Sequence, residues 1–372
     1  MLSLLLIFML AQGVTPDAII IGMEGEANSL SANEENLGMH LVIKQVNEDG
    51  GIHGRQLQVV AYPRGRVRPV QHAVENARRL VEEDSVFLLF NFGGPASVQI
   101  GAYAMQNDVP NLFPHTALLT VDGDRHVFTS YPRYAGESRA MLKYLALERN
   151  VARIAVIYAP NIYGDYFREQ VASLAPQFGY EFVGAQALEN DAASAAGQMR
   201  ILAEGDPDIV LMALYPAGAR KAIEAKAALA WDVRLVSTGP LTDERYLNVA
   251  DGAAEGTIGF CYYPDPGESD APGIVEYRRQ LARYFPGHEP NRYSLYGYVY
   301  GKLVVEGLRR AGEELTEAGF LDAMESIHDW QSGGIMPPVS FSSTDHHAQE
   351  AGFICELENG RFKPLSAWLV PS

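Results

Sequence analysis

Short apolar segments alternate with segments of helical periodicity along most of the chain, and this alternation constrains the fold more than any other feature of the sequence. The apolar segments are rich in β-branched and aromatic residues and lack strict polar alternation, as expected of parallel strands that are covered on both faces. We expect strands at residues 18–22, 57–62, 86–90, 109–113, 153–158, 181–185, 208–213, 233–236 and 256–261.

Between these strands, apolar residues recur at the spacing of one helical face. Two such faces consist of Val70, Val74, Ala77, Leu80 and Val81, and of Phe167, Val171, Leu174 and Phe178. Glycines at residues 50–51, 179 and 205 mark helix ends. Repeated strand–helix–strand units with short turns predict an α/β fold built on doubly wound parallel sheets.

The chain length of 372 residues and the large number of strands indicate two lobes rather than one. The strand series restarts after residues 127–132, which we expect to cross from the first lobe to the second. Helices expected at residues 270–285, 293–311 and 315–327 return to the first lobe. Antiparallel strands are expected at residues 338–341, 351–357 and 361–369, with a hairpin turn at Asn359-Gly360.

The predicted architecture is therefore two doubly wound parallel-sheet lobes joined by a multi-strand hinge. Lobe 1 is expected to contain residues 14–130 and 264–334. Lobe 2 and the hinge are expected to contain residues 131–263 and 335–372.

The first 13 residues have the pattern of an export signal. Residues 1–11 are apolar and uncharged, and this run is too short to span a bilayer. Ala11 and Gly13 are small residues at the −3 and −1 positions of a cleavage site before Val14. The segment has no basic residue at its start, and a buried strand is the alternative. We predict a signal peptide over residues 1–13 and an exported protein.

The two cysteines, Cys261 and Cys355, do not follow this signal, which favours a protein without a lipid anchor. In an oxidising compartment the two can form a disulfide. Both lie in apolar, strand-like segments, so two buried thiols are an equal alternative.

The formal net charge of −17 argues against partners with an anionic surface, because such a field repels nucleic-acid phosphates and anionic membranes. Residues 22–26, after the first expected strand, lack the glycine spacing of a dinucleotide-binding loop, and the sequence contains no P-loop motif. We therefore predict no nucleic-acid partner, no membrane-lipid partner and no cofactor.

Motifs of catalysis or metal binding are absent from the sequence. No Gly-x-Ser-x-Gly elbow occurs, and histidines cluster only at Asp345-His346-His347. Adjacent side chains on an extended segment point to opposite faces, which makes a poor metal pair. We interpret residues 345–347 as a solvated loop and predict neither a metal site nor a catalytic residue.

Aromatic and small polar residues gather where the expected parallel strands end. Residues 91–97 and 114–117 follow strands of lobe 1, and residues 159–164 and 214–216 follow strands of lobe 2. Doubly wound sheets bind ligands at these ends, close to the N-termini of the following helices. Aromatic walls around a few backbone donors are typical of a small-molecule site. For Tyr163 and Tyr215 the alternative is a role as surface-loop aromatics.

The segment Asn47-Glu48-Asp49-Gly50-Gly51-Ile52-His53-Gly54-Arg55-Gln56-Leu57 resembles the INAxGGIxGxKL signature of the branched-chain amino-acid (Leu/Ile/Val) binding family, the type I periplasmic solute-binding proteins of ABC transporters. Residues 71–77, residues 109–114 and Ile162-Tyr163-Gly164 are similar to further segments of that family, and the resemblance covers nearly the whole mature chain. It implies a periplasmic, monomeric protein that captures a small molecule by lobe closure. An ABC permease in the inner membrane would be its partner, and it would have no enzymatic activity.

The resemblance also implies the ligand site. Residues of lobe 1 would hold the ligand, and Tyr163 and Tyr215 of lobe 2 would close over it. The predicted ligand-binding residues are Ser31, Phe92, Gly93, Ala96, Ser97, His115, Thr116, Ala117, Tyr163, Tyr215, Leu241 and Tyr293.

The chain departs from the amino-acid binders of this family at three places. Those binders commonly have a Ser-rich loop where Gly94-Pro95-Ala96-Ser97 stands. They place a Thr where Ala117 stands and an acidic residue where Pro240-Leu241 stands, and both hold the ammonium group of the ligand. An ammonium buried without such partners loses several kcal/mol. The ligand is expected to be a small amino-acid-like compound or an aromatic or aliphatic carboxylate. The carboxylate without an amine agrees better with these departures. An α-amino acid would need Asp243 or Glu244 to move inward and contact its ammonium group.

Two other functions compete with import. The same fold serves as a ligand sensor that signals to a receptor or regulator, and the pocket chemistry is shared. An α/β enzyme acting on a small acid would need a positioned catalytic group. His115, the only histidine on a predicted pocket loop, would be that group, but we interpret it as a hydrogen-bond donor to the ligand or backbone.

Overall fold

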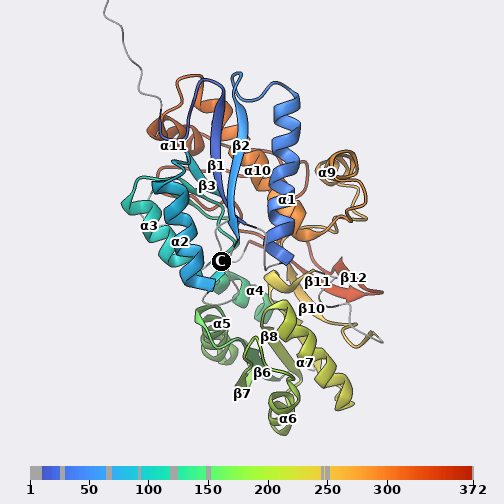
Figure 1. The fold of residues 1–372 in the computed structure, drawn as a ribbon. Helices are drawn as coiled ribbons and strands as arrows, with labels where there is room; N and C mark the ends of the chain where they lie inside the picture. The colour runs from blue at the N-terminus through green and yellow to red at the C-terminus, as the bar shows by residue number, and fades with distance from the viewer. Residues whose placement is uncertain are drawn as a thin grey trace, which may run out of the picture. The chain divides into compact units, whose positions relative to one another are not determined.

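The computed structural model describes residues 11–25, 30–63, 69–90, 94–117, 125–147, 152–243, 247 and 252–370. The chain forms two compact units (Figure 1). Unit 1 contains Met1–Ser130, Ala271–Gly334 and Pro338–Ala348, and unit 2 contains Tyr131–Asp270, Ile335–Pro337 and Gln349–Ser372. Each unit is therefore assembled from segments that are far apart in the sequence.

Unit 1 is built on a parallel sheet of five strands in the order β2-β1-β3-β4-β5. These strands are β1 (Ala18–Gly25), β2 (Gln56–Pro63), β3 (Leu88–Phe90), β4 (Asn111–Leu112) and β5 (Val127–Phe128). Figure 1 shows α2 (Pro69–Glu82) and α3 (Ser97–Gln106) on one face of this sheet, and α1 (Leu30–Glu48) and α10 (Arg292–Ala311) on the other. The described part of the unit also contains α9 (Pro272–Tyr284) and α11 (Glu317–Glu325).

Glycines allow α1 and α10 to pack closely. A Cβ atom on Gly38 would lie 2.1 Å from the carbonyl oxygen of Ser294, and one on Gly297 would lie 1.8 Å from the carbonyl oxygen of Glu35. Neither position has room for a side chain without moving a backbone. The N-terminal half of α1 is therefore held against the start of α10, which brings Glu35 close to that start.

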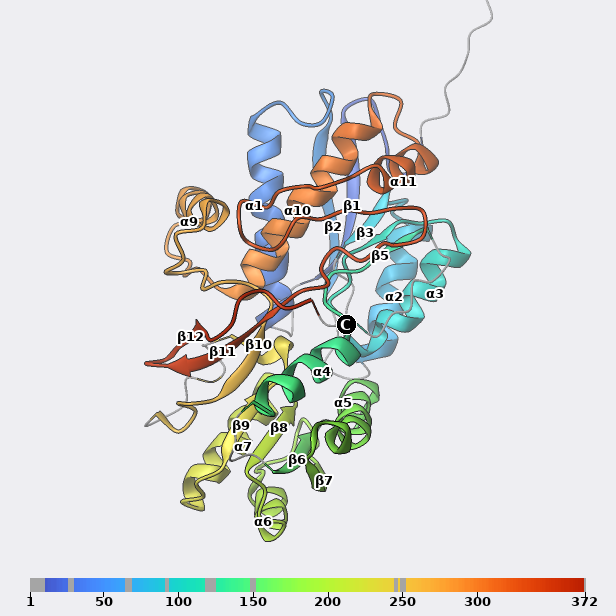
Figure 2. The same cartoon turned by 180° about the vertical axis from the view of Figure 1, so that it is seen from behind.

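Unit 2 is built on a seven-stranded sheet in the order β12-β11-β10-β9-β8-β6-β7. Its parallel strands are β6 (Arg153–Tyr158), β7 (Glu181–Ala187), β8 (Ile209–Ala213), β9 (Arg234–Ser237) and β10 (Ile258–Cys261). β11 (Phe353–Glu358) and β12 (Arg361–Pro364) continue the sheet in antiparallel pairing. Figure 2 shows α5 (Ile162–Leu174) on one face, and α6 (Ala196–Glu204) and α7 (Pro216–Ala228) on the other. α4 (Tyr134–Leu145) packs against α5. The predicted α/β class with parallel sheets is confirmed.

A disulfide between Cys261 of β10 and Cys355 of β11 links two neighbouring strands of unit 2. Gly259 lies opposite Cys355 in the strand register, and a Cβ atom there would come within 3.2 Å of the Cys355 sulfur. Asn359 and Gly360, between β11 and β12, both have positive φ angles of 53° and 74°. The predicted hairpin turn therefore has the left-handed backbone that an Asn-Gly pair favours.

Residues 338–348 belong to unit 1, and two predictions for this region are wrong. Residues 338–341 form no strand, because Val339 makes only an isolated bridge with Trp330. In the predicted solvated loop at residues 345–347 only Asp345 is exposed, and His346 and His347 are buried. The ring of His346 stacks on Phe128, with centroids 4.1 Å apart, and only 3% of His346 is exposed.

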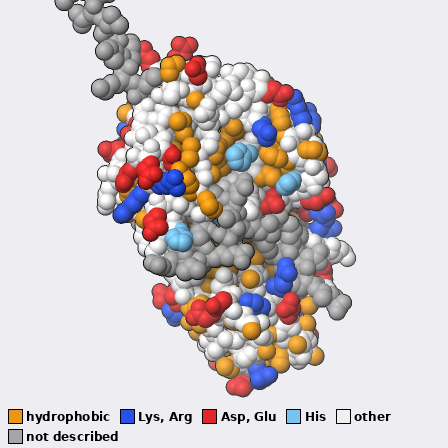
Figure 3. Space-filling view, in the orientation of Figure 1, with side chains coloured by type: hydrophobic (Ala, Val, Ile, Leu, Met, Phe, Trp, Pro, Cys, Tyr) orange, Lys and Arg blue, Asp and Glu red, His pale blue; other side chains and the backbone are white. Residues whose placement is uncertain are grey.

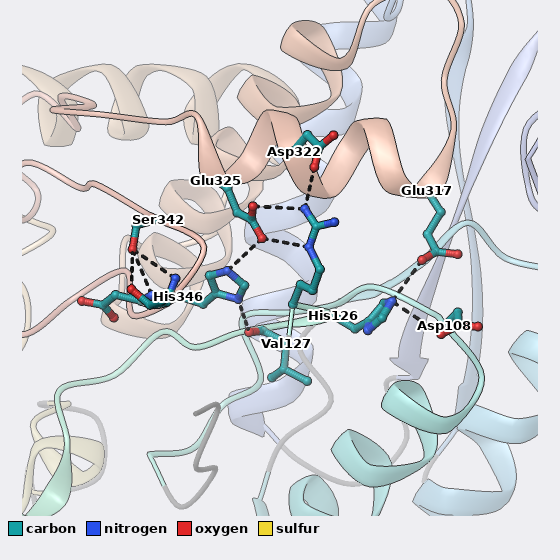
Figure 4. A network of polar contacts seen from close by, with 11 residues as sticks. Asp108, His126, Val127, Glu317, Asp322, Glu325, Ser342 and His346 are labelled. Carbon is teal, nitrogen blue, oxygen red and sulfur yellow. Dashed lines mark hydrogen bonds and ion pairs between the residues drawn. The ribbon is translucent and has the colours of Figure 1, made fainter. Parts of the chain in front are cut away.

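A polar network surrounds His346 (Figure 4). The guanidinium of Arg125 donates to Asp322 at 2.6 Å and to Glu325 at 3.0 Å. The Glu325 oxygen that accepts from Nε of Arg125 also lies 3.4 Å from Nε2 of His346. Burial lowers the pKa of His346 below its usual value, although Glu325 opposes this change. The network ties α11 and the 338–348 segment to β5.

The described chain begins with contacts made by residues of the predicted signal region. The side-chain amide of Gln12 donates to the carbonyl of Val81 at 2.8 Å, and the carbonyl of Gly13 accepts from the N–H of Ile20 at 2.8 Å. Val14 is buried and bridges Ile19. Cleavage after Gly13 would remove both bonds, and the cleavage site stays a prediction.

Acidic and basic side chains lie interspersed on the face of each unit that Figure 3 shows. The net charge of −17 is therefore not gathered into one acidic area on this face. None of the described helices is both long and apolar enough to cross a membrane.

Candidate functional site

Two segments of unit 1 that were predicted to contact the ligand are bonded to each other. A short 3₁₀ turn, η1 (Gly94–Ala96), leads into α3, and the Ser97 hydroxyl donates to the carbonyl of Gly94 at 2.8 Å. The N–H of Gly94 in turn donates to the carbonyl of His115 at 3.3 Å. Ala96 and Ser97 are buried. The turn before α3 is thus hydrogen-bonded to the segment that follows β4.

His115 follows β4 and lies among groups from α1 and α10. Its Nδ1 lies next to Oε1 of Glu35, whose side chain is 3% exposed. The ring stacks on Tyr293 with centroids 5.8 Å apart and an interplanar angle of 16°. Tyr296 lies on it at a centroid distance of 5.3 Å, and the Tyr296 hydroxyl donates to the carbonyl of Phe113 at 2.6 Å. The imidazole is therefore held by one carboxylate and two phenol rings.

Tyr293, which stacks on His115, is the second residue of α10, so its place depends on how this helix begins. The side-chain oxygen of Asn291 accepts from the N–H of Tyr293 at 3.1 Å and from that of Ser294 at 2.9 Å, which caps the helix. The side-chain amide of Asn291 also donates to Glu34 of α1 at 2.9 Å. The capped start of α10 is therefore fixed to α1.

The other predicted residues of unit 1 are placed as follows. Thr116 is buried, its N–H donates to the carbonyl of Pro114 at 2.7 Å, and Ala117 is half-buried. Ser31 lies on α1, but its side chain is outside the described part of the structure. Phe92 and Gly93 lie outside the described residues.

In unit 2, Tyr163 lies at the start of α5. The side-chain oxygen of Asn161 caps this helix by accepting from the N–H of Tyr163 at 3.1 Å. A Cβ atom on Gly164 would lie 2.0 Å from the carbonyl oxygen of Ala159, so glycine permits this tight entry into the helix. The phenol of Tyr163 is thereby directed to Thr238, whose hydroxyl oxygen lies 2.6 Å from that of Tyr163.

Tyr163 belongs to an aromatic cluster. Its ring lies 5.6 Å from that of Tyr215, 5.6 Å from that of Tyr134 and 5.4 Å from that of Phe167. The Asn161 amide donates to the hydroxyl of Tyr215 at 3.4 Å. Burial raises the pKa of Tyr163 well above its usual value. Tyr163 is 5% exposed and Tyr215 is half-buried, so the alternative of a surface-loop aromatic is wrong for Tyr163.

Glu137 of α4 has a buried carboxyl group that contacts the loop carrying Thr238. One Glu137 oxygen accepts from the N–H of Gly239 at 2.8 Å, and the other accepts from the hydroxyl of Tyr262. A Cβ atom on Gly239 would lie 2.1 Å from the Tyr262 ring, so only glycine allows this arrangement. Burial raises the pKa of Glu137 to about 8. Sequence reasoning missed this residue because its partners come from other elements.

Leu241 differs in its surroundings from the other predicted residues. It is fully buried in the apolar core of unit 2, together with Leu247, Cys261 and Cys355. Asp243, which was considered as a partner for an ammonium group, is 1% exposed. Leu241 therefore supports the 238–243 loop from the core side.

The potential for metal binding and a hollow in unit 2 both bear on where a ligand could sit. Among the described residues, no three His, Cys, Asp or Glu side chains are grouped so that they could hold a metal ion. A hollow of about 440 Å³ in unit 2 is bordered by Asp265, Arg361, Lys363 and Trp368. It contains none of the predicted ligand-binding residues.

Comparisons with known proteins agree with this architecture. Residues 18–361 match a family model described as "Periplasmic binding protein". The "Leu/Ile/Val-binding protein homolog 7" of Brucella abortus (strain 2308) is 22% identical over 302 residues, which cover 76% of this chain and 74% of that protein.

Solved structures share the fold over nearly the whole chain. A fatty acid ABC transporter substrate-binding protein from Thermomonospora curvata has a TM-score of 0.85 at 18% identity, covering 97% of this chain and 94% of that one. A branched chain amino acid ABC transporter protein from Thermus thermophilus with bound valine has a TM-score of 0.83 at 17% identity and covers 97% of each chain. The family match and this shared fold confirm the resemblance found in the sequence, and the chain belongs to the periplasmic binding protein family, with the type I fold of the Leu/Ile/Val-binding proteins.

Proposed function

We propose that this protein captures a small organic carboxylate outside the cytoplasm and delivers it to the permease of an ABC importer, without catalysing a reaction. Family membership supports a substrate-binding role and implies an extracytoplasmic location. The observation that carries the proposal is that each unit contains a pair of packed aromatic rings with hydrogen-bonding groups, at residues predicted to contact a ligand. In unit 1 the pair is Tyr293 with His115, and in unit 2 it is Tyr163 with Tyr215.

The proposed ligand contacts come from both units. Unit 1 would contribute Ser31, Phe92, Gly93, Ala96, Ser97, His115, Thr116, Ala117 and Tyr293, and unit 2 would contribute Tyr163 and Tyr215, with Leu241 supporting the neighbouring loop from the core. A ligand that contacts both units favours the closed over the open form by its binding energy. The closed form would therefore be populated mainly when a ligand is bound.

The proposed ligand class is based on two positions whose side chains offer no polar or charged group to an ammonium. Ala117 has no hydroxyl, and Pro240-Leu241 has no charge. The names of two structural relatives mention a fatty acid and valine, and both of these compounds carry a carboxylate on an apolar body. For this chain we favour the carboxylate without an amine.

The test is identification of the small molecule that co-purifies with the protein, by native mass spectrometry, followed by calorimetric titration. Tight binding of an aromatic or aliphatic acid, together with a smaller radius of gyration in solution scattering, would support the proposal. Tight binding of branched-chain amino acids alone would contradict the ligand class. Conversion of any bound compound to a product, abolished by replacing His115, would contradict the absence of catalysis.

A further inference from the structure

Gly13 is packed against the backbone of unit 1 at a position that favours glycine. Its φ angle is 71°, in the left-handed region that residues with a side chain rarely adopt. A Cβ atom on Gly13 would lie 2.1 Å from the backbone nitrogen of Phe87. The carbonyl of Gly13 accepts from the N–H of Ile20 at 2.8 Å. Gly13 is therefore bonded to β1 and packed against the residue that precedes β3.

The two residues beside Gly13 are held in place as well. The side-chain amide of Gln12 donates to the carbonyl of Val81 in α2 at 2.8 Å, although Gln12 is exposed. Val14 is 6% exposed and forms an isolated antiparallel bridge with Ile19. Residues 12–14 are thus joined to α2 and β1, although they precede the first strand.

A cut after Gly13 would remove these contacts. The N–H of Ile20 would lose its acceptor, and the space beside Phe87 would lose its occupant. The nitrogen of Val14, which donates to the carbonyl of Ala11 at 3.1 Å, would become a charged α-ammonium without that acceptor. Hydration of this charge would compete with the packing of the Val14 side chain, since a buried charge without a partner is costly. A protein that begins at Val14 should therefore be less stable.

A cut two residues earlier, after Ala11, avoids most of these losses. The new terminus is then on Gln12, which is exposed, so the ammonium stays in water. The side-chain bond of Gln12 and the backbone bond of Gly13 are kept. Of the bonds described above, the one from the N–H of Val14 to Ala11 is given up.

The residues around the two sites favour the later cut, because cleavage sites have small residues at both −1 and −3. A cut after Gly13 has Ala11 at −3, whereas a cut after Ala11 has Met9 there. Both sites have a small residue at −1. The sequence pattern and the packing of Gly13 therefore point to different bonds, and the packing has a physical purpose only if Gly13 is kept.

We infer that the exported protein is cut between Ala11 and Gln12, and that residues 12–14 are a structural part of the mature chain. The inference goes beyond the proposed function and concerns processing alone. None of residues 11–14 is among the proposed ligand contacts, so its failure would leave solute capture intact.

The first arm of the test determines the N-terminus of the exported protein. The full chain of 372 residues is produced in a bacterium with a periplasm, released from the periplasm, and analysed by intact mass and by mass-spectrometric sequencing of the first peptide. The expected first residue is Gln12, in part cyclised to pyroglutamate. A chain that begins at Val14, or at any other residue, would overturn the inference.

The second arm compares two forms that begin at Gln12 and at Val14, each released from a fusion partner without an extra residue. The form that begins at Val14 should melt about 4 °C or more below the other, because it lacks the bonds of Gln12 and Gly13 and the packing beside Phe87. Equal melting temperatures in calorimetry would overturn the inference.

The third arm tests the packing of Gly13 in the form that begins at Gln12. Gly54→Ala is the matched control, because Gly54 also has a positive φ angle, of 81°, but a Cβ atom there meets nothing within 4 Å. Both substitutions strain the backbone, and Gly13→Ala also meets the backbone of Phe87. Gly13→Ala should therefore lower the melting temperature by about 4 °C more than Gly54→Ala. Equal losses would overturn the structural role of residue 13.

Discussion

The hydroxyl oxygen of Tyr163 lies 2.6 Å from that of Thr238, and both groups are buried. This hydrogen bond joins the start of α5 to the loop that follows β9. If Thr238 donates, the Tyr163 proton is available to a ligand; if Tyr163 donates, the bond only fixes the ring. Substitutions at the two positions distinguish these arrangements.

Tyr163→Phe should destabilise the protein by about 1 kcal/mol, because it removes one buried hydrogen bond. It should also weaken ligand binding about fivefold if the hydroxyl donates to the ligand. Denaturant unfolding and calorimetric titration measure the two effects. Tyr166→Phe on the same helix is the control and should change neither. Tyr163→Ala is a poorer probe, since loss of this buried ring costs about 3–5 kcal/mol.

Glu137 should make stability fall as the pH rises. Its pKa is raised from 4.5 to about 8 by burial, so the folded protein binds more protons than the unfolded chain between these values. The stabilisation is complete below pH 4.5 and is lost progressively up to pH 8, by an amount on the order of 4 kcal/mol. Urea unfolding at pH 5 and pH 8 should show this loss in the wild type and not in Glu137→Gln. Equal pH dependence in both proteins would contradict the assignment.

His346 should make the stability of the protein fall as the pH falls. Burial lowers its pKa below 6.5, so the unfolded chain takes up a proton before the folded protein does. The stability that His346 contributes should therefore be lost as the pH falls below about 6.5. Comparing the unfolding midpoints of wild type and His346→Gln at pH 7.5 and pH 5.5 measures this contribution. A wild type no more sensitive to acid than the variant would exclude it.

Breaking the disulfide should weaken unit 2. Cys261 and Cys355 enclose a long loop, and loss of such a link typically costs about 2–5 kcal/mol. The double variant Cys261→Ala and Cys355→Ala should unfold at a lower temperature than the oxidised wild type and should not respond to reductant. Calorimetry with and without dithiothreitol tests both points. A melting profile unchanged by reduction of a verified disulfide would contradict the prediction.

Gly297→Ala should destabilise unit 1 by several kcal/mol, because the added methyl group meets the carbonyl oxygen of Glu35. It should also weaken ligand binding, since it pushes Glu35 away from His115. Gly197→Ala is the matched control. A Cβ atom at Gly197 in α6 meets nothing within 4 Å, so this change should be neutral or stabilise the protein by up to about 1 kcal/mol. Similar effects of the two substitutions would refute the close-packing argument.

The sequence alone determined the sheet-and-helix order of this protein, because strand and helix periodicities are local consequences of backbone geometry and burial. The Asn359-Gly360 turn was predictable for the same reason, since two adjacent residues supply the left-handed backbone. Tertiary structure alone decided the pairing of Glu35 with His115, of Glu137 with Tyr262 and of His346 with Phe128. Each pair joins side chains from elements far apart in the chain. Their meeting depends on how closely the elements approach, which single residues such as Gly297 and Gly239 permit and no local pattern records.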